Sequence, residues 1–135
     1  MQVTFHRAFD FARDQDEAMD ALLALGVDRV LTSGGASSAL EGAYALQRLV
    51  ERAGNSLTVM AGGAITASNV AEVVRLSGVR EVHLRAAVSV ESAMSFRRRA
   101  VTLSRPNVPG DYDRVVTQAG EVARTMNALA DLANQ

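Results

Sequence analysis

The stretch LGVDRVLTSG at residues 25–34 decides how this chain is organised, because it recurs as SGVREVHLRA at residues 77–86. In both copies a glycine precedes a short apolar segment, and small or polar residues follow it. Such a segment is typical of a buried β-strand. The recurrence therefore predicts a unit of two strand–helix modules that is present twice in the chain.

Strands and helices are expected to alternate along the whole chain. Strands are predicted at residues 3–9, 29–34, 57–63 and 81–87. Helices are predicted at residues 15–25, 39–53, 69–76 and 112–133, with a further short helix at 89–99. Asp14, Ser38 and Ser68 stand at the N-cap positions of the first three helices. Helices between consecutive strands are typical of parallel strands joined by right-handed crossovers.

This alternation predicts a single α/β domain over residues 1–135, in which residues 100–111 form a loop before the last helix. The expected architecture is a four-stranded parallel (β/α)4 half of a TIM-type barrel, because a complete barrel takes about 250 residues. A doubly wound sheet is the competing architecture. A half-barrel leaves both outer strands with unpaired edges, so we expect a homo-oligomer or pairing with another half.

Composition excludes several classes of function. The net charge of −1 favours neither nucleic acid nor an anionic membrane as a partner. The chain has no cysteine, which removes disulfides, thiolate nucleophiles and zinc–thiolate sites and fits a cytoplasmic protein. All fourteen basic side chains are arginine, so lysine Schiff-base chemistry is excluded within this chain.

Three candidate catalytic residues follow the first predicted strand, at the edge where α/β proteins gather their function: His6, Arg7 and Asp10. Strand alternation predicts that Thr4 and His6 face the barrel interior and that Arg7 faces away. His6 is a candidate general acid or base, and Arg7 is a candidate clamp for an anion. The structural alternative is a hydrogen-bonded histidine beside an aspartate that caps the turn or pairs with an arginine.

Two glycine-containing loops follow the second and third strands. TSGGASS at residues 32–38 precedes a helix N-terminus, and MAGGAIT at residues 60–66 places two glycines after a strand. Backbone N–H groups in such loops suit a phosphate or carboxylate, although an ordinary turn has the same composition. The candidate anion-binding residues in these loops are Ser33, Gly34, Gly35, Gly62 and Gly63.

The fourth strand carries two further polar residues. His83 and Arg85 alternate onto one face of VHLRAA and are expected opposite His6. Arg85 is therefore a sixth candidate anion-binding residue, and an imidazole and a guanidinium around one pocket favour an anionic ligand. The structural alternative is an ion pair between Arg85 and an acid such as Glu81.

Taken in order, VTFHRAFD, GVDRVLTSG, ALEG, VMAGGAI and GVREVH resemble the CutC family of copper homeostasis proteins, most strongly over residues 3–86. The resemblance implies a cytoplasmic (β/α) barrel, of which these would be the fifth to eighth strands. It also implies copper as a ligand. Arg85 stands where a small residue such as serine is expected from the family, and this narrows the pocket or replaces a ligand contact.

Copper ligands are scarce in this chain. Cu(I) prefers soft thiolate and thioether ligands, and the chain has no cysteine. The candidate metal-binding residues are His6, His83 and Met60, in no recognisable ligand spacing. If copper binds, we expect the other half of the barrel to supply ligands.

Three functions stay open at this point. The first is a copper homeostasis protein that binds or handles copper. The second is a barrel enzyme, of unknown reaction, that acts on a small anionic or phosphorylated substrate. The third is a truncated fragment without independent function, which its exposed strand edges would leave prone to aggregation.

Overall fold

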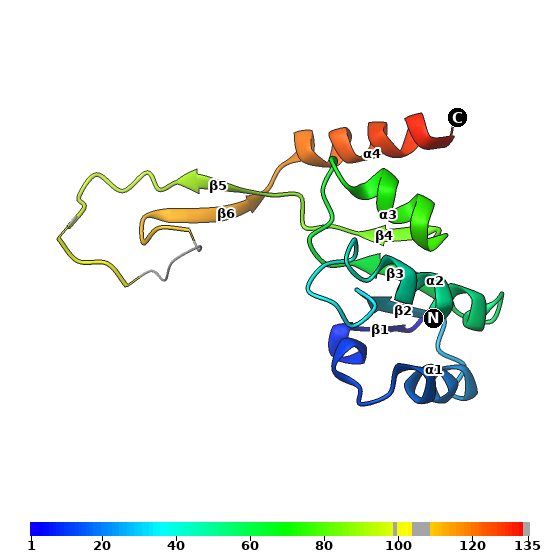
Figure 1. Cartoon of the computed structure of the whole chain (residues 1–135). Helices are drawn as coiled ribbons and strands as arrows, with labels where there is room; N and C mark the ends of the chain where they lie inside the picture. The colour runs from blue at the N-terminus through cyan, green and yellow to red at the C-terminus, as the bar shows by residue number, and fades with distance from the viewer. Residues whose placement is uncertain (99, 104–108, 134–135) are drawn as a thin grey trace.

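A computed structural model describes residues 1–98, 100–103 and 109–133 of the chain. Its central feature is a four-stranded parallel sheet in the order β1-β2-β3-β4 (Figure 1). These strands are β1 (Thr4–Phe5), β2 (Arg29–Thr32), β3 (Thr58–Gly62) and β4 (Glu81–His83). Each strand pairs with the next one in sequence, so the predicted α/β class and parallel pairing are confirmed.

Helices connect the strands of the parallel sheet, and a last helix follows the strands. They are the 3₁₀ helix η1 (Arg7–Phe11) and the α-helices α1 (Gln15–Ala24), α2 (Ala43–Ala53), α3 (Val70–Ser77) and α4 (Ala119–Ala133). Asp14 caps α1 as predicted, because its carboxylate accepts the backbone N–H groups of Asp16 and Glu17. Gly78 ends α3 in the left-handed conformation that glycine adopts without steric cost.

The first strand is shorter than predicted. The sequence predicts a strand over residues 3–9, but β1 ends at Phe5 and a 3₁₀ helix begins at Arg7. The cause is local, since Nδ1 of His6 accepts the backbone N–H of Ala8 and so caps the turn. The alternation that placed His6 inside and Arg7 outside is therefore wrong beyond Phe5. Thr4 pairs with Arg29 on the face opposite the buried Val30, and its hydroxyl accepts a hydrogen bond from Nη1 of Arg29.

The second helix begins later than predicted, at Ala43 instead of residue 39. Ser38 still caps a turn, because its hydroxyl accepts the backbone N–H of Glu41. The third helix begins at Val70, one residue after its predicted start, and Asn69 takes the cap position instead of Ser68.

The helix predicted at residues 89–99 is wrong. Instead β5 (Ala87–Glu91) pairs antiparallel with β6 (Asp113–Thr117), and this hairpin extends away from the sheet and its helices (Figure 1). Val88 and Val90 alternate with polar residues, and this pattern favours a strand over a helix. The last helix consequently begins at Ala119, not at residue 112. Residues 99 and 104–108, which include part of the predicted loop 100–111, lie outside the described residues.

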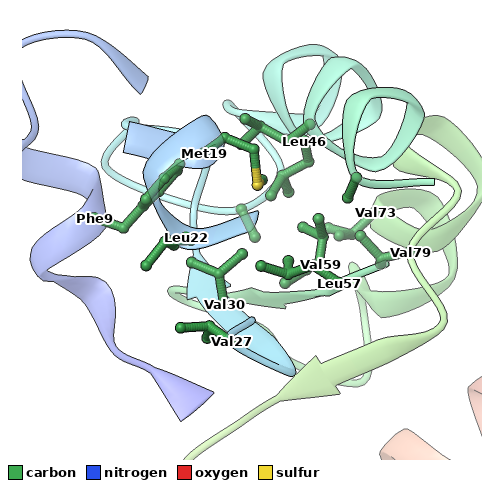
Figure 2. Close-up of a cluster of buried hydrophobic side chains, with 14 of the residues drawn as sticks. Phe9, Met19, Leu22, Val27, Val30, Leu46, Leu57, Val59, Val73 and Val79 are labelled. Carbon is green, nitrogen blue, oxygen red and sulfur yellow. The ribbon is translucent and has the colours of Figure 1, made fainter. Parts of the chain in front are cut away.

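One face of the sheet carries the core. Val30 and Val59 point toward the helices, and Leu46 and Val73 pack onto them from α2 and α3 (Figure 2). Ala61 of β3 belongs to the same buried cluster. The intervening strand residues are less buried and lie on the opposite face: Arg29, Leu31, Thr58, Met60 and Glu81. On that face Arg29 of β2 forms an ion pair with Glu81 of β4, across β3. None of the helices in the described part of the chain is long and apolar enough to cross a membrane.

Candidate functional site

A compact hydrogen-bond cluster lies at the carboxyl ends of β1 and β2. One carboxylate oxygen of Asp10, which belongs to η1, accepts hydrogen bonds from Oγ1 of Thr32 at 2.5 Å and from the backbone N–H groups of Ser33 and Gly35 at 3.0 and 3.1 Å. Its second oxygen accepts Nε of Arg7 at 2.7 Å and the hydroxyl of Ser33 at 3.2 Å. The turn after β1 is thereby fixed to the loop after β2.

The Asp10 side chain is buried, with 6% of its surface exposed. Burial alone would raise the pKa of this carboxyl group. The hydrogen bonds from Thr32, Arg7 and the two backbone N–H groups outweigh burial and hold the pKa of Asp10 below its ordinary value. Asp10 is therefore ionised at neutral pH, and it is a fixed negative charge instead of a proton donor.

Arg7 is held on two sides. Its Nε donates to Asp10, and its Nη2 donates to the Ser33 hydroxyl at 2.6 Å. The side chain stays 42% exposed, so the guanidinium is anchored without being enclosed. Its Nη1 reaches toward the turn after β3, where a Cβ built on Gly63 would lie 3.2 Å from it.

Close backbone packing forms the loops of the cluster. A Cβ at Gly42 would lie 1.8 Å from the Ser33 carbonyl oxygen, and one at Gly34 would lie 2.6 Å from the Gly42 carbonyl oxygen. The backbone N–H of Ala39 donates to the Gly63 carbonyl at 2.9 Å, which joins the loops after β2 and β3. The two loops selected from the sequence are therefore neighbours in space.

The loop at Ser33, Gly34 and Gly35 already holds an anion, and that anion is the protein's own. The N–H groups of Ser33 and Gly35 donate to Asp10, and the N–H of Gly34 donates to the Thr32 hydroxyl. Thr32 was not among the candidates predicted from the sequence. It is fully buried at the end of β2, and a buried hydroxyl requires a hydrogen-bond partner, which here is the Asp10 carboxylate.

A cavity of about 390 Å³ lies beside Arg7, at the carboxyl ends of β3 and β4. It brings together Arg7, Gly63, His83 and Arg85 of the predicted candidates. His6 and Met60 are not among its lining residues. Glu121 and Thr125 also line the cavity, from α4. No sequence motif indicated them, because they come from the far end of the chain.

The three metal candidates are not assembled into a site. His6 uses Nδ1 to accept the backbone N–H of Ala8 and lies on an exposed turn. Met60 pairs in register with Glu81, and Gly62 pairs with His83, so Met60 and His83 share a face of adjacent strands. Within residues 1–98, 100–103 and 109–133, no group of three or more histidine or acidic side chains is placed to hold a metal ion.

Comparison with known proteins places this cluster in a family. The model of the CutC family matches residues 1–88, which include Asp10, Arg7 and the loops after β2 and β3. The chain belongs to the CutC family. The match ends at the start of β5, so the hairpin and α4 of this CutC chain lie beyond it.

Full-length relatives extend the CutC similarity over nearly the whole chain. The copper homeostasis protein cutC homolog of Homo sapiens is 43% identical over 130 residues, which make up 96% of this chain and 47% of the relative. The corresponding protein of Mus musculus is 42% identical over the same shares. A CutC family protein of Chromobacterium violaceum is 44% identical over 129 residues, 96% of this chain and 52% of that protein. The chain thus spans about half the length of the curated relatives it matches.

A solved structure supports the same assignment. The CutC protein of Streptococcus agalactiae superposes with a TM-score of 0.58 at 34% sequence identity. The superposition covers 62% of this chain and 41% of that protein. The α/β fold of this CutC chain, with its parallel sheet, is therefore the fold of a part of that larger protein.

Proposed function

We propose that this chain acts in cytoplasmic copper homeostasis, as the half of a CutC barrel that contains its fifth to eighth strands. The observation that carries the proposal is the family match over residues 1–88, which contains the whole Asp10–Arg7–Ser33 cluster. That cluster lies at the carboxyl ends of parallel strands, where barrels of this type place their binding sites.

The proposal requires a partner for the sheet. β1 and β4 are its outer strands, and each leaves one edge without a neighbouring strand among the described residues. Open parallel edges favour pairing with further strands. We propose that a second copy of the chain, or the N-terminal half of a CutC protein, supplies them. The polar Arg29–Glu81 pair on the uncovered face would then lie in the barrel interior.

We propose that copper binds at the face shared by β3 and β4. Met60 and His83 are the best-placed ligands because they share a face of neighbouring strands, whereas His6 has one ring nitrogen already occupied. Two such ligands leave a Cu(I) site incomplete, so the other half would have to complete it.

Copper retention under reducing conditions tests this directly. We expect the full-length human relative to retain stoichiometric Cu(I) after dialysis, as measured by inductively coupled plasma mass spectrometry. The present chain alone should retain substoichiometric metal, reduced further by Met60→Leu and unchanged by Met126→Leu, which alters an exposed methionine. Absence of retained copper in the full-length protein would reject direct copper binding.

A second candidate function is catalysis on a small anionic substrate, and the anchored guanidinium of Arg7 beside a cavity favours it. In this reading Arg7 or Arg85 clamps the anion. The sequence indicates His6 as the acid or base, but His83 lines the cavity and His6 does not, so His83 is the better placed of the two. Product formation from a panel of phosphate monoesters and carboxylates, followed by NMR, tests it. Loss of turnover in His6→Gln or His83→Gln, with ligand binding retained, would support catalysis.

A further inference from the structure

We propose that Arg7 and the turn after β3 form a preorganised binding site for an oxyanion, which is a carboxylate or phosphate group of a small molecule. The site lies in the cavity beside Arg7 and requires no metal. This site is independent of copper handling. An enzyme acting on an anionic substrate would use the same site, but the site could also bind an anion without catalysis.

The first support is the way in which Arg7 is held. An arginine carries five N–H donors in one plane. Contacts to Asp10 through Nε and to Ser33 through Nη2 fix that plane, while Nη1 has no hydrogen-bond partner within the described ranges. Because the side chain is already ordered, ligand binding costs less conformational entropy. Nη1 is thus an oriented, unsatisfied donor at the cavity wall.

The second support is the shape of the turn opposite Nη1. Gly63 and Ala64 both adopt positive φ angles, of 121° and 52°. A Cβ at Gly63 would lie 3.2 Å from both Nη1 of Arg7 and Cβ of Ser33. Glycine at this position therefore keeps the guanidinium from being crowded by a side chain. A φ angle of 121° is rare for residues other than glycine, so the backbone conformation at Gly63 itself leaves the space beside Nη1 free of a side chain.

The third support is the charge of the cavity wall. Its charged lining residues are Arg7, Arg85 and Glu121, and Glu121 forms an ion pair with Arg124 in the same helix. Asp10 lies on the other side of Arg7, where its carboxylate accepts hydrogen bonds from Arg7, the Thr32 hydroxyl and the backbone N–H groups of Ser33 and Gly35. The cavity wall therefore carries two guanidinium groups against one carboxylate, and that carboxylate is paired with Arg124, so these charges favour an anion.

Asp10 also explains why the ligand binds beside β3 and not in the loop after β2. The N–H groups of Ser33 and Gly35 are already donated to the Asp10 carboxylate. A second anion at that loop would meet a fixed negative charge. Leu31, Ile65 and Leu84 line the open cavity and supply apolar contacts for the remainder of a small molecule. A volume of about 390 Å³ lies within the usual range for small-molecule sites.

Titration with inorganic phosphate and, separately, with acetate tests the site at constant ionic strength. Two-dimensional NMR of the arginine Nε–H signals follows binding. We expect saturable binding at millimolar concentration in the whole chain, with the Arg7 signal among those that shift. Saturation by phosphate assigns a phosphorylated ligand and saturation by acetate a carboxylate, and either result supports the site. No saturable shift with either anion would overturn it.

Variants identify the anchor. Arg7→Met should raise the dissociation constant about tenfold or more, because a charge-assisted hydrogen bond to the anion is lost. Arg13→Met removes an arginine that is 90% exposed on the same turn region and should leave binding unchanged. Equal weakening in both variants, or unchanged binding in Arg7→Met, contradicts the proposal. If Arg7→Met does not fold, the Arg7 signal of the unmodified chain decides: its failure to shift during saturation contradicts the proposal. If an anion binds at Arg7 but no product forms, the binding site is supported and only the proposed catalytic function is rejected.

Discussion

The Asp10 carboxylate accepts both the backbone N–H of Ser33, at 3.0 Å, and its side-chain hydroxyl, at 3.2 Å. These residues are 23 positions apart and belong to the connections after two neighbouring strands. Their contact closes the carboxyl edge of the sheet and sets the orientation of Arg7, which bonds to both of them. The behaviour of the whole site therefore depends on one ionised aspartate.

Removing the charge of Asp10 should loosen this edge. In Asp10→Asn an amide nitrogen replaces an oxygen that accepts hydrogen bonds, so Arg7 or Ser33 loses its partner. We expect a loss of about 1–3 kcal/mol in the free energy of unfolding, measured by urea denaturation. Asp16→Asn, at a half-exposed side chain of α1 whose ion pair with Arg48 is long at 3.6 Å, should change it by less than about 0.5 kcal/mol. Equal stability of the two variants would contradict the role given to Asp10.

Acid should destabilise the chain through the same residue. Hydrogen bonds from Thr32 and Arg7 hold the pKa of Asp10 below its ordinary value against the effect of burial, and Arg29 lowers the pKa of Glu81. The folded state then binds fewer protons than the unfolded state. The stabilisation is fully present above the ordinary carboxyl pKa of about 4 and is lost as the pH falls through the lowered values.

Melting temperature measured against pH checks this dependence. It should fall as the pH decreases below about 5, where unfolded carboxylates begin to bind protons. The fall should be shallower in Asp10→Asn, which has no carboxyl group to protonate at that position. A variant with the same acid slope as the original chain would exclude Asp10 as a contributor.

Glycine at position 42 should be required for the contact between the β2 loop and α2. In Gly42→Ala the new Cβ would lie 1.8 Å from the Ser33 carbonyl oxygen, so the loop would have to move away from the helix. Overpacking of this kind costs about 1–3 kcal/mol. In Gly120→Ala nothing lies within 4 Å of the new Cβ, and the helix should gain up to about 1 kcal/mol. Chemical denaturation of the two variants should give shifts of opposite sign.

The core beneath the site should tolerate no cavity. Leu46 is fully buried between α2 and the sheet (Figure 2), and Leu46→Ala should cost about 2–5 kcal/mol. Tyr44 is 71% exposed on the same helix, and Tyr44→Ala should have an effect within about 0.5 kcal/mol. A small effect of Leu46→Ala on the thermal midpoint would mean that this helix is not packed as described.

Local patterns predicted the parallel sheet, because each of its strands is a short apolar segment followed by a helix. They failed where a contact overrides the pattern. His6 caps a turn instead of continuing the strand, and Val88 and Val90 belong to a hairpin whose partner strand lies more than twenty residues later. Strand alternation placed Arg7 on the face away from the barrel interior, and its approach to Gly63 depends instead on the long-range contact of Asp10 with the loop after β2.

Native mass spectrometry of the purified chain tests the half-barrel account most directly. Each copy has a mass of 14.3 kDa. The account predicts a discrete dimer, in which each copy covers the open β1 and β4 edges and the uncovered sheet face of the other. A population made only of monomers, or of aggregates without defined mass, would contradict the pairing of two copies.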